Sequence, residues 1–414
     1  MVRLKGFEKL TNVDEALAIF LKALKPKKLD PEQVSIENAL GRVTTENIFA
    51  SSDLPQFDRS AVDGYAVRAE DTFGSSQIKP KTLKLIAKGD AVSQGQARQI
   101  GTGNPLPKGA DAIVMLEHTQ VSANMLEIRA PVKPSENVSK KGEDIRKSEV
   151  AVKAGTRLRP HHLAMLAALG IVEVNVTRKP KVAIVSTGNE LVELGEKASA
   201  TQIVNSNRFL ITGLCRELNV QPMYLGIARD DESDIKSKLV KGLETADALI
   251  TTGGTSVGAA DLVPIVVDKL GKPGVVVHGV ALRPGMPTAL GILKAKPVFV
   301  LSGYPVAAAV GFEVFVRPTL LKLQGAGHEF RPMIQAQLSR RVGGALGRRV
   351  YLRVKVAKKE DGYVAEPIVT KGSGLLSSMT KANGYVIIPE NREGLREGET
   401  VTVNLFGPVA EGEE

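Results

Sequence analysis

The chain has 414 residues, of which 43% are apolar and 24% are charged, a composition that excludes a disordered or fibrous protein. This length accommodates about two to four domains. The one cysteine, Cys215, excludes internal disulfides and a zinc-thiolate site. The net charge of +10 indicates anionic ligands, but the 4% of aromatic residues, the lack of Trp and the lack of a recognisable RNA- or DNA-binding motif argue against nucleic acid.

The first predicted element is a helix over residues 11–24, where apolar residues recur at helical spacing and Thr11 and Asp14 are placed like a capping pair. No signal peptide precedes it, which predicts a cytoplasmic protein. Residues 51–139 contain short strand-like runs broken by Gly and Pro, a pattern that predicts a small β-rich domain. Near residue 160 the helical pattern returns. We expect this second helix to join the first in a discontinuous linking domain of residues 1–50 and 140–178.

Residues 179–325 alternate continuous apolar runs with helical patterns, which predicts an α/β domain with a mainly parallel central sheet. Within it, residues 297–316 have the length of a membrane span but are interrupted by Gly303, Pro305 and Glu313, so a strand, a turn and a buried helix are the better interpretation. Residues 326–414 alternate apolar and polar residues between Gly-containing turns, which predicts a small C-terminal β-barrel or sandwich, of which we favour the barrel. The predicted fold class is therefore multidomain, with α/β and β parts and no membrane contact.

Residues 251–261 read TTGGTSVGAAD and follow one of the predicted strands of the α/β domain. They have neither the lysine of a phosphate loop nor the glycine spacing of a dinucleotide fingerprint. What remains is a turn at Gly253 and Gly254 that can present amide hydrogens and hydroxyl groups to an oxyanion. On this stretch alone, a plain strand-to-helix turn capped by Asp261 is an equally good interpretation.

Polar residues also follow other strands of the same domain. The stretches STGNEL (186–191), VNSNR (204–208) and ARDD (228–231) are each typical of a cap or turn when taken singly. Because the carboxyl ends of parallel strands meet at one edge of a sheet, together they predict a ligand site there. Its candidate residues are Ser186, Thr187, Gly188, Glu190, Asn205, Asn207, Arg208, Asp230, Gly253, Gly254, Ser256, Gly258 and Asp261.

The stretches LRPGMPTALG (282–291) and LSGYPVAA (301–308) follow two further strands. In the first, Arg283 with Pro284 is the candidate anion clamp, although a solvated arginine is the more common role for such a residue in isolation. In the second, the candidates are Ser302, Gly303 and Pro305. No serine or cysteine of the chain has a convincing paired base, so covalent catalysis is not expected.

These residues predict an acid-rich and hydroxyl-rich site for a phosphorylated or oxyanionic ligand, bridged by a divalent metal. Carboxylate and hydroxyl oxygens suit a hard cation, so Asp230 and Asp261 are the candidate ligands of Mg²⁺.

Eight motifs in their order and spacing resemble the molybdopterin molybdenumtransferase family, which includes MoeA and the C-terminal half of gephyrin. They are FDRSAVDGYAV, GTGNPLPKGADAIVMLE, KKGEDI, STGNEL, VNSNR, TTGGTSVGAAD, LRPGMPTALG and LSGYPVAA, and they extend across essentially the whole chain. The resemblance implies four domains, an elongated homodimer and an enzyme that uses Mg²⁺. The implied reaction inserts molybdate into the dithiolene of adenylylated molybdopterin and releases AMP, in molybdenum cofactor biosynthesis.

The resemblance also implies which residues act in catalysis, and it implies contact with the adenylyltransferase that supplies the substrate. Three of the implied residues lie outside the α/β domain and would complete the active-site cleft from the partner subunit. The implied catalytic residues are Asp63, Thr102, Asp144, Glu190, Asp230 and Asp261.

The sequence departs from the family pattern around the candidate anion clamp. Met286 stands where the family commonly has a second basic residue, Ser302 and Tyr304 alter a Pro-Gly-Asn-Pro turn, and Ala307 replaces a frequent serine. Tungstate therefore stays open beside molybdate as the substrate. The alternative function is a scaffold or sensor that binds the pterin nucleotide without turnover.

Overall fold

The computed structural model describes residues 10–87, 89, 91–255, 262–327, 329–368 and 374–411. The chain forms two compact units, each of which is described by itself below. The first comprises Met1–Glu32, Gly41–Val43 and Thr177–Glu414, and the second comprises Gln33–Leu40 and Thr44–Val176.

The first unit is built on a six-stranded sheet in the order β16-β13-β17-β21-β20-β18. Strands β16 (Gln221–Ala228), β13 (Lys181–Thr187), β17 (Ala248–Thr252) and β21 (Lys296–Leu301) are parallel, whereas β20 (Ala289–Leu293) and β18 (Gly274–His278) are antiparallel. The predicted α/β domain with a mainly parallel sheet is confirmed. Residues 297–316 form most of β21 and then helical structure, as the sequence predicts.

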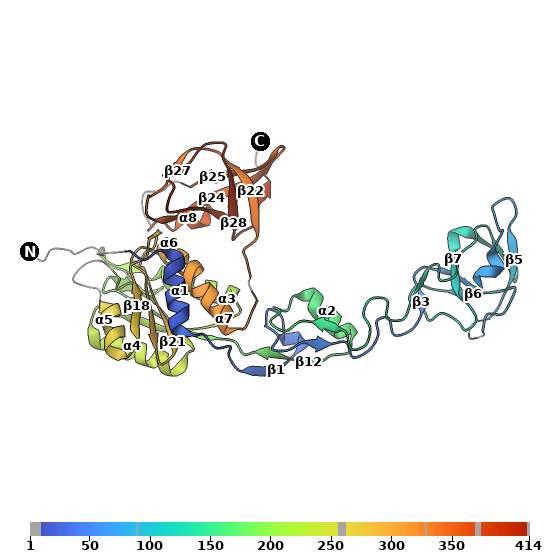
Figure 1. The fold of residues 1–414 in the computed structure, drawn as a ribbon, viewed down its shortest axis with the longest axis horizontal. Coiled ribbons are helices and arrows are strands. Elements are labelled where there is room, and N and C mark those ends of the chain that lie inside the picture. Colours follow the sequence, from blue (N-terminus) through green and yellow to red (C-terminus); the bar gives the residue numbers. More distant parts are fainter. Residues whose placement is uncertain are drawn as a thin grey trace, which may run out of the picture. The chain divides into compact units, whose positions relative to one another are not determined.

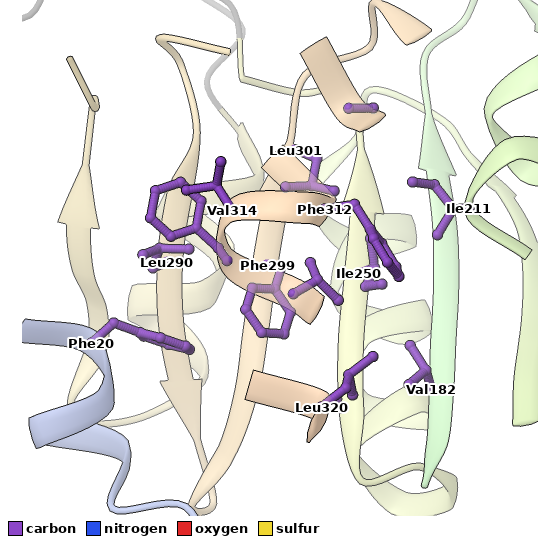
Figure 2. Packing of buried hydrophobic residues seen from close by; sticks show 14 of the residues in the cluster. Phe20, Val182, Ile211, Ile250, Leu290, Phe299, Leu301, Phe312, Val314 and Leu320 are labelled. Carbon is purple, nitrogen blue, oxygen red and sulfur yellow. The ribbon is translucent and has the colours of Figure 1, made fainter. Parts of the chain in front are cut away.

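Helices cover both faces of this sheet because successive strand residues alternate between two apolar cores (Figure 1). One face packs against α1 (Val13–Leu24), α3 (Ser206–Glu217), α6 (Pro305–Gly311) and α7 (Arg317–Leu323). The other face packs against α4 (Glu232–Thr245) and α5 (Leu262–Leu270). Figure 2 shows the first core, in which Phe299 of β21 lies among side chains from the surrounding helices.

Helix α1 differs in two respects from the sequence prediction. Its N-cap is Asn12, whose side chain accepts the Asp14 amide at 3.0 Å, so the predicted Thr11–Asp14 capping pair is wrong. Its buried residues, among them Phe20, pack on the sheet of the first unit, whereas α2 (Pro160–Ala168) lies in the second unit. The expectation that both helices share a linking domain is wrong, because the apolar face of α1 complements the sheet. The remaining predicted domain boundaries stay a prediction.

The C-terminal part of the first unit is a closed five-stranded barrel, which confirms the sequence prediction. Its strands pair in the order β24-β25-β22-β28-β26 and back to β24. The strand bounds are β22 (Met333–Leu338), β24 (Arg349–Lys359), β25 (Gly362–Pro367), β26 (Gly384–Ile388) and β28 (Thr400–Leu405). Outside the ring, β19 (Leu282–Arg283) pairs with β24 and joins the barrel to the α/β part.

The second unit contains a six-stranded sheet in the order β7-β4-β6-β5-β9-β8. These strands are β7 (Ala112–Met115), β4 (Gly64–Val67), β6 (Gln96–Ile100), β5 (Lys81–Leu85), β9 (Met125–Ile128) and β8 (Thr119–Ser122). A separate small core gathers around Leu166 of α2. None of the helices in the described part of the chain has the length and apolar composition that a membrane span requires.

Candidate functional site

The carboxyl ends of the four parallel strands meet at one edge of the sheet. The register pairs Ser186 with Thr252, Thr252 with Leu301, and Thr187 with Ala228. The loops that follow these strands therefore leave the sheet side by side, where ligands of open α/β sheets bind. The structure thus brings together the predicted residues of the segments 186–190, 228–230, 252–254 and 302–305.

Glycines from two of these loops pack closely against each other and against neighbouring residues. Gly253 and Gly254 adopt the left-handed region, with φ of +99° and +65°. A Cβ atom on Gly253 would lie 2.4 Å from the Thr187 carbonyl oxygen, and one on Gly254 would lie 2.5 Å from Val263 Cγ2. Gly303 faces Gly253, since a Cβ atom built on Gly303 would lie 3.5 Å from the Gly253 Cα. The left-handed backbone and this close packing leave no room for a side chain at either position.

Two buried polar atoms beside these glycines have no hydrogen-bond partner among the described residues. They are Thr187 Oγ1 and Asn207 Oδ1, on side chains whose residues are 3% and 7% exposed. The Asn207 side chain is held at its other atom, because Nδ2 donates to the Gly303 carbonyl at 2.7 Å. An unmade hydrogen bond of a buried group costs about 1–3 kcal/mol. Both atoms are therefore suited to bind a polar ligand.

Two predicted acidic residues lie at the same edge. The Asn189 amide donates to Asp230 Oδ2 at 3.1 Å, and the Asp230 amide donates to Asn189 Oδ1 at 3.2 Å. These reciprocal bonds tie the loop after β13 to the loop after β16. The Glu190 carboxylate folds over Gly188, where a Cβ atom would lie 2.6 Å from Glu190 Oε2.

The predicted site residues Ser256, Gly258 and Asp261 lie outside the described residues, so one of the two predicted Mg²⁺ ligands is not placed. Within the described ranges, no three side chains of His, Cys, Asp or Glu converge as a metal-binding group would.

Asn205 and Arg208 belong to a hydrogen-bonded network at the start of α3. Asn205 accepts the Ser186 hydroxyl at 3.2 Å and donates to the Tyr224 hydroxyl at 2.8 Å. Glu193 accepts from the Tyr224 hydroxyl at 2.6 Å and from Arg208 at 2.9 Å. Burial and the Glu193 carboxylate both raise the pKa of Tyr224, which keeps its hydroxyl protonated.

The sequence analysis did not identify Glu193 or Tyr224. Glu193 follows a short strand and Tyr224 lies within β16, and neither belongs to a motif whose spacing indicates a binding site. Arg208 is already paired with Glu193, and its predicted contact with the substrate stays a prediction.

Arg283, Pro284 and Ser302 line a separate pocket of about 560 Å³ between the α/β part and the barrel. Met286, Tyr304 and Ala307, which with Ser302 are the four departures from the family pattern, line the same pocket. The barrel contributes three further arginines that sequence reasoning missed, namely Arg341, Arg348 and Arg353. The runs SRR and GRR contain the first two, but only the folded barrel places them at the same pocket as Arg283. The pocket is therefore strongly basic. Pro305 begins α6 beside it.

The remaining predicted residues lie in the second unit. Asp63 Oδ1 accepts the Thr102 amide at 2.8 Å and the Thr102 hydroxyl at 3.1 Å. These bonds lower the pKa of Asp63 below its ordinary value of 3.8, the backbone bond most, and keep the carboxylate charged. Asp144 is exposed and shares no hydrogen bond with Asp63 or Thr102 in the described structure. The structure thus pairs the first two residues and leaves the third apart.

Comparison with known proteins gives the same family along the whole chain. Residues 11–170 match the MoeA N-terminal region (domain I and II), residues 183–322 a probable molybdopterin binding domain, and residues 335–406 the MoeA C-terminal region (domain IV). The chain is 41% identical to a Methanocaldococcus jannaschii protein named provisionally as a molybdopterin biosynthesis protein, with 98% of both chains covered.

Two further relatives have more definite names. A molybdopterin molybdenumtransferase of Haemophilus influenzae is 33% identical over 96% of this chain and 99% of its own. The crystal structure of a molybdopterin biosynthesis MoeA protein from Pyrococcus horikoshii is 36% identical, covers 96% of this chain and 100% of its own, and superimposes with a TM-score of 0.82. The chain therefore belongs to the molybdopterin molybdenumtransferase (MoeA) family.

Proposed function

We propose that this protein is a molybdopterin molybdenumtransferase that inserts molybdate, or tungstate, into adenylylated molybdopterin and releases AMP. The observation that carries the proposal is its similarity to the Haemophilus influenzae enzyme over nearly the full length of both chains. The glycine-lined edge of the sheet and the basic pocket support it, because the reaction requires sites for a pterin nucleotide and for an oxyanion.

The edge of the sheet is the proposed site of the pterin nucleotide. The bare backbone at Gly253 and Gly254 would approach its anionic part, and Thr187 Oγ1 and Asn207 Oδ1 would make the hydrogen bonds that they lack among the described residues. Asn205 and Ser186 would set the position of the β13 and α3 ends through their mutual bond. Binding a phosphorylated ligand at such a turn requires no lysine, since amides and hydroxyls serve as donors.

We propose that a Mg²⁺ ion binds at the same edge, with Asp230 as its ligand from the described residues. Asp230 uses one carboxylate oxygen to accept the Asn189 amide, and no described residue donates to its other oxygen. Mg²⁺ is commonly held by one or two carboxylates together with phosphate oxygens and water, so Asp230 with Asp261 would suffice. When bound, the ion would offset negative charge that develops as the adenylate is cleaved. Glu190 and the fixed Asp230 carboxylate would orient the nucleotide.

The basic pocket is the proposed site of the oxyanion. Arg283 from the α/β part and Arg341 and Arg348 from the barrel line it. The barrel arginines thus supply positive charge in a pocket where Met286 stands in place of a basic residue. Molybdate and tungstate carry the same charge, and both are candidates.

We further propose a cytoplasmic homodimer. In it, Asp63, Thr102 and Asp144 of one subunit complete the site of the other, and the molybdopterin adenylyltransferase delivers the substrate directly.

A single-turnover assay tests the proposal. Purified protein, adenylylated molybdopterin and Mg²⁺ are mixed with molybdate or tungstate, and AMP and metal-bound pterin are measured. We expect AMP release that depends on the oxyanion, lost in Asp230→Asn and retained in Asp231→Asn, because Asn caps α4 as well as Asp231 does. Tight pterin binding without AMP release would contradict the proposal and favour a scaffold or sensor.

A further inference from the structure

The C-terminal ends of α1 and α7 border an open groove of about 690 Å³ on the first unit. Four lysines line it, namely Lys22, Lys25, Lys28 and Lys322, and all four are exposed. We call these residues the lysine groove. The opposite end of α1 lies next to the barrel, where Asp14 pairs with Arg349. The lysine groove is therefore at the far end of that helix from the barrel.

Helix dipoles account for only part of this charge. Lys22 and Lys322 lie in the last turns of α1 and α7, where cations stabilise the exposed carbonyls. Each helix C-terminus carries about half a negative charge, so the two ends together offset about one lysine. Among the described residues, no acidic side chain lines the groove, and Lys22, Lys25 and Lys322 form no ion pair. An excess of positive charge therefore remains.

The local backbone is adapted to hold these lysines. Lys25 caps α1 in the left-handed region, with φ of 46°, a position that Gly or Asn usually occupies. Gly325 follows α7 with φ of +67°, and a Cβ atom there would lie 2.7 Å from Lys28 Cδ. The lack of a side chain at residue 325 is what allows the Lys28 stem to lie across this surface. The left-handed backbone of Lys25 ends α1 at the border of the groove.

The lining distinguishes between classes of anionic ligand. A site for single-stranded nucleic acid would be expected to present aromatic side chains for base stacking and Arg, and the described lining contains neither. Separate flexible ammonium groups along an open groove instead suit several carboxylates of one extended chain. We propose that the lysine groove binds an acidic segment of a partner protein. This inference does not depend on the proposed function.

The test uses the full-length protein and a fluorescein-labelled hexaglutamate peptide, with binding measured by fluorescence anisotropy in 50 and 500 mM KCl. In the low-salt buffer we expect the variant with Lys22, Lys25, Lys28 and Lys322 all changed to Gln to bind about tenfold more weakly, since exposed ion pairs are individually weak but here act together. The matched control changes Lys236, Lys241, Lys358 and Lys359 to Gln, which removes the same charge from other exposed positions. It should bind within about twofold of the unchanged protein.

The single substitution Lys322→Glu provides a second test that does not depend on four simultaneous changes. It should also weaken binding of the hexaglutamate peptide. Three results would overturn the proposal. They are an equal loss in the control variant, no binding to the unchanged protein at low salt, or tighter binding of a hexathymidylate oligonucleotide to the same lysines. All variants should remain folded because the substituted side chains are exposed. The melting temperatures of the groove variants should be slightly lower than that of the control, since Lys22 and Lys322 lie at helix C-terminal ends that cations stabilise.

Discussion

Gly253 illustrates how a single residue shapes the candidate site. Its φ of +99° is unfavourable for any residue with a side chain, and its Cα faces Gly303 of the neighbouring loop. The Thr187 hydroxyl lies beside it, 2.8 Å from the place that a Cβ atom would occupy. A larger residue would therefore displace the buried Thr187 hydroxyl, which lies against the backbone of Gly253 and Gly254.

We predict that Gly253→Ala lowers the affinity for the pterin nucleotide while the protein still folds. The added Cβ atom would lie 2.4 Å from the Thr187 carbonyl oxygen, so the turn must move. Gly398→Ala is the matched control, because Gly398 has a similar left-handed backbone, with φ of +71°, and open space around it. Both variants should lose about 1–2 kcal/mol of stability from the backbone conformation. Isothermal titration calorimetry with the pterin nucleotide compares the two variants, and only Gly253→Ala should bind it more weakly. Equal affinities would show that the turn does not contact the ligand.

At the scale of one element, α1 shows how packing overrides sequence proximity. The helix precedes the segment that leads to the second unit, yet its apolar face is buried on the α/β sheet. Phe20 is fully buried and meets Phe299 edge to face, with ring centroids 5.4 Å apart. Aromatic pairs in this geometry contribute stability beyond the buried area. Helix α1 is therefore part of the core that supports β21 and the loop after it.

We predict that Phe20→Ala destabilises the first unit by about 3–5 kcal/mol, because it leaves a cavity against Phe299. Ile19→Ala on the same helix is the control, since Ile19 is 39% exposed. Its effect should stay within about 0.5 kcal/mol. Denaturant unfolding followed by far-UV circular dichroism measures both changes. Similar losses in the two variants would mean that α1 is not anchored through Phe20.

At the scale of the whole molecule, ion pairs join the barrel to the α/β part of the first unit. Glu313, in the π-helical turn Phe312–Val316, receives two hydrogen bonds from Arg331, at 2.9 and 2.7 Å, just before the first barrel strand. Arg349 of the barrel binds Asp14 of α1, and this bond lowers the pKa of Asp14. The basic pocket lies along the same seam, so its shape depends on these contacts and on the pairing of β19 with β24.

We predict that Glu313→Ala costs about 1–3 kcal/mol, because it leaves the partly buried Arg331 and Arg317 without their carboxylate partner. The variant should also bind tungstate more weakly, since the seam that forms the basic pocket loosens. Glu399→Ala removes a bidentate partner of Arg392 within the barrel, where the pair is more exposed, and should have a much smaller effect on both quantities. Thermal unfolding and tungstate titration provide the measurements. A stable variant with unchanged tungstate affinity would contradict the role assigned to the seam.

The sequence by itself determined the fold class and the edge of the sheet at which the site lies. Both follow from local rules, because continuous apolar runs of strand length predict buried parallel strands and polar residues after each strand must gather where the strands end. Repeated glycines after β17 likewise indicated a tight turn, since few other residues adopt a left-handed backbone.

Only the tertiary structure decided which residues meet across long distances in the chain. Helix α1 packs on the sheet rather than with α2, because side-chain complementarity and not chain order selects its partner. Arg348 and Arg283 line the same basic pocket because β24 of the barrel pairs with β19. Glu193 and Tyr224 join Arg208 and Asn205 through bonds that no spacing predicts. The periodicity of apolar residues reflects which face of a single helix or strand is buried, whereas contacts between distant residues depend on how all the elements pack together.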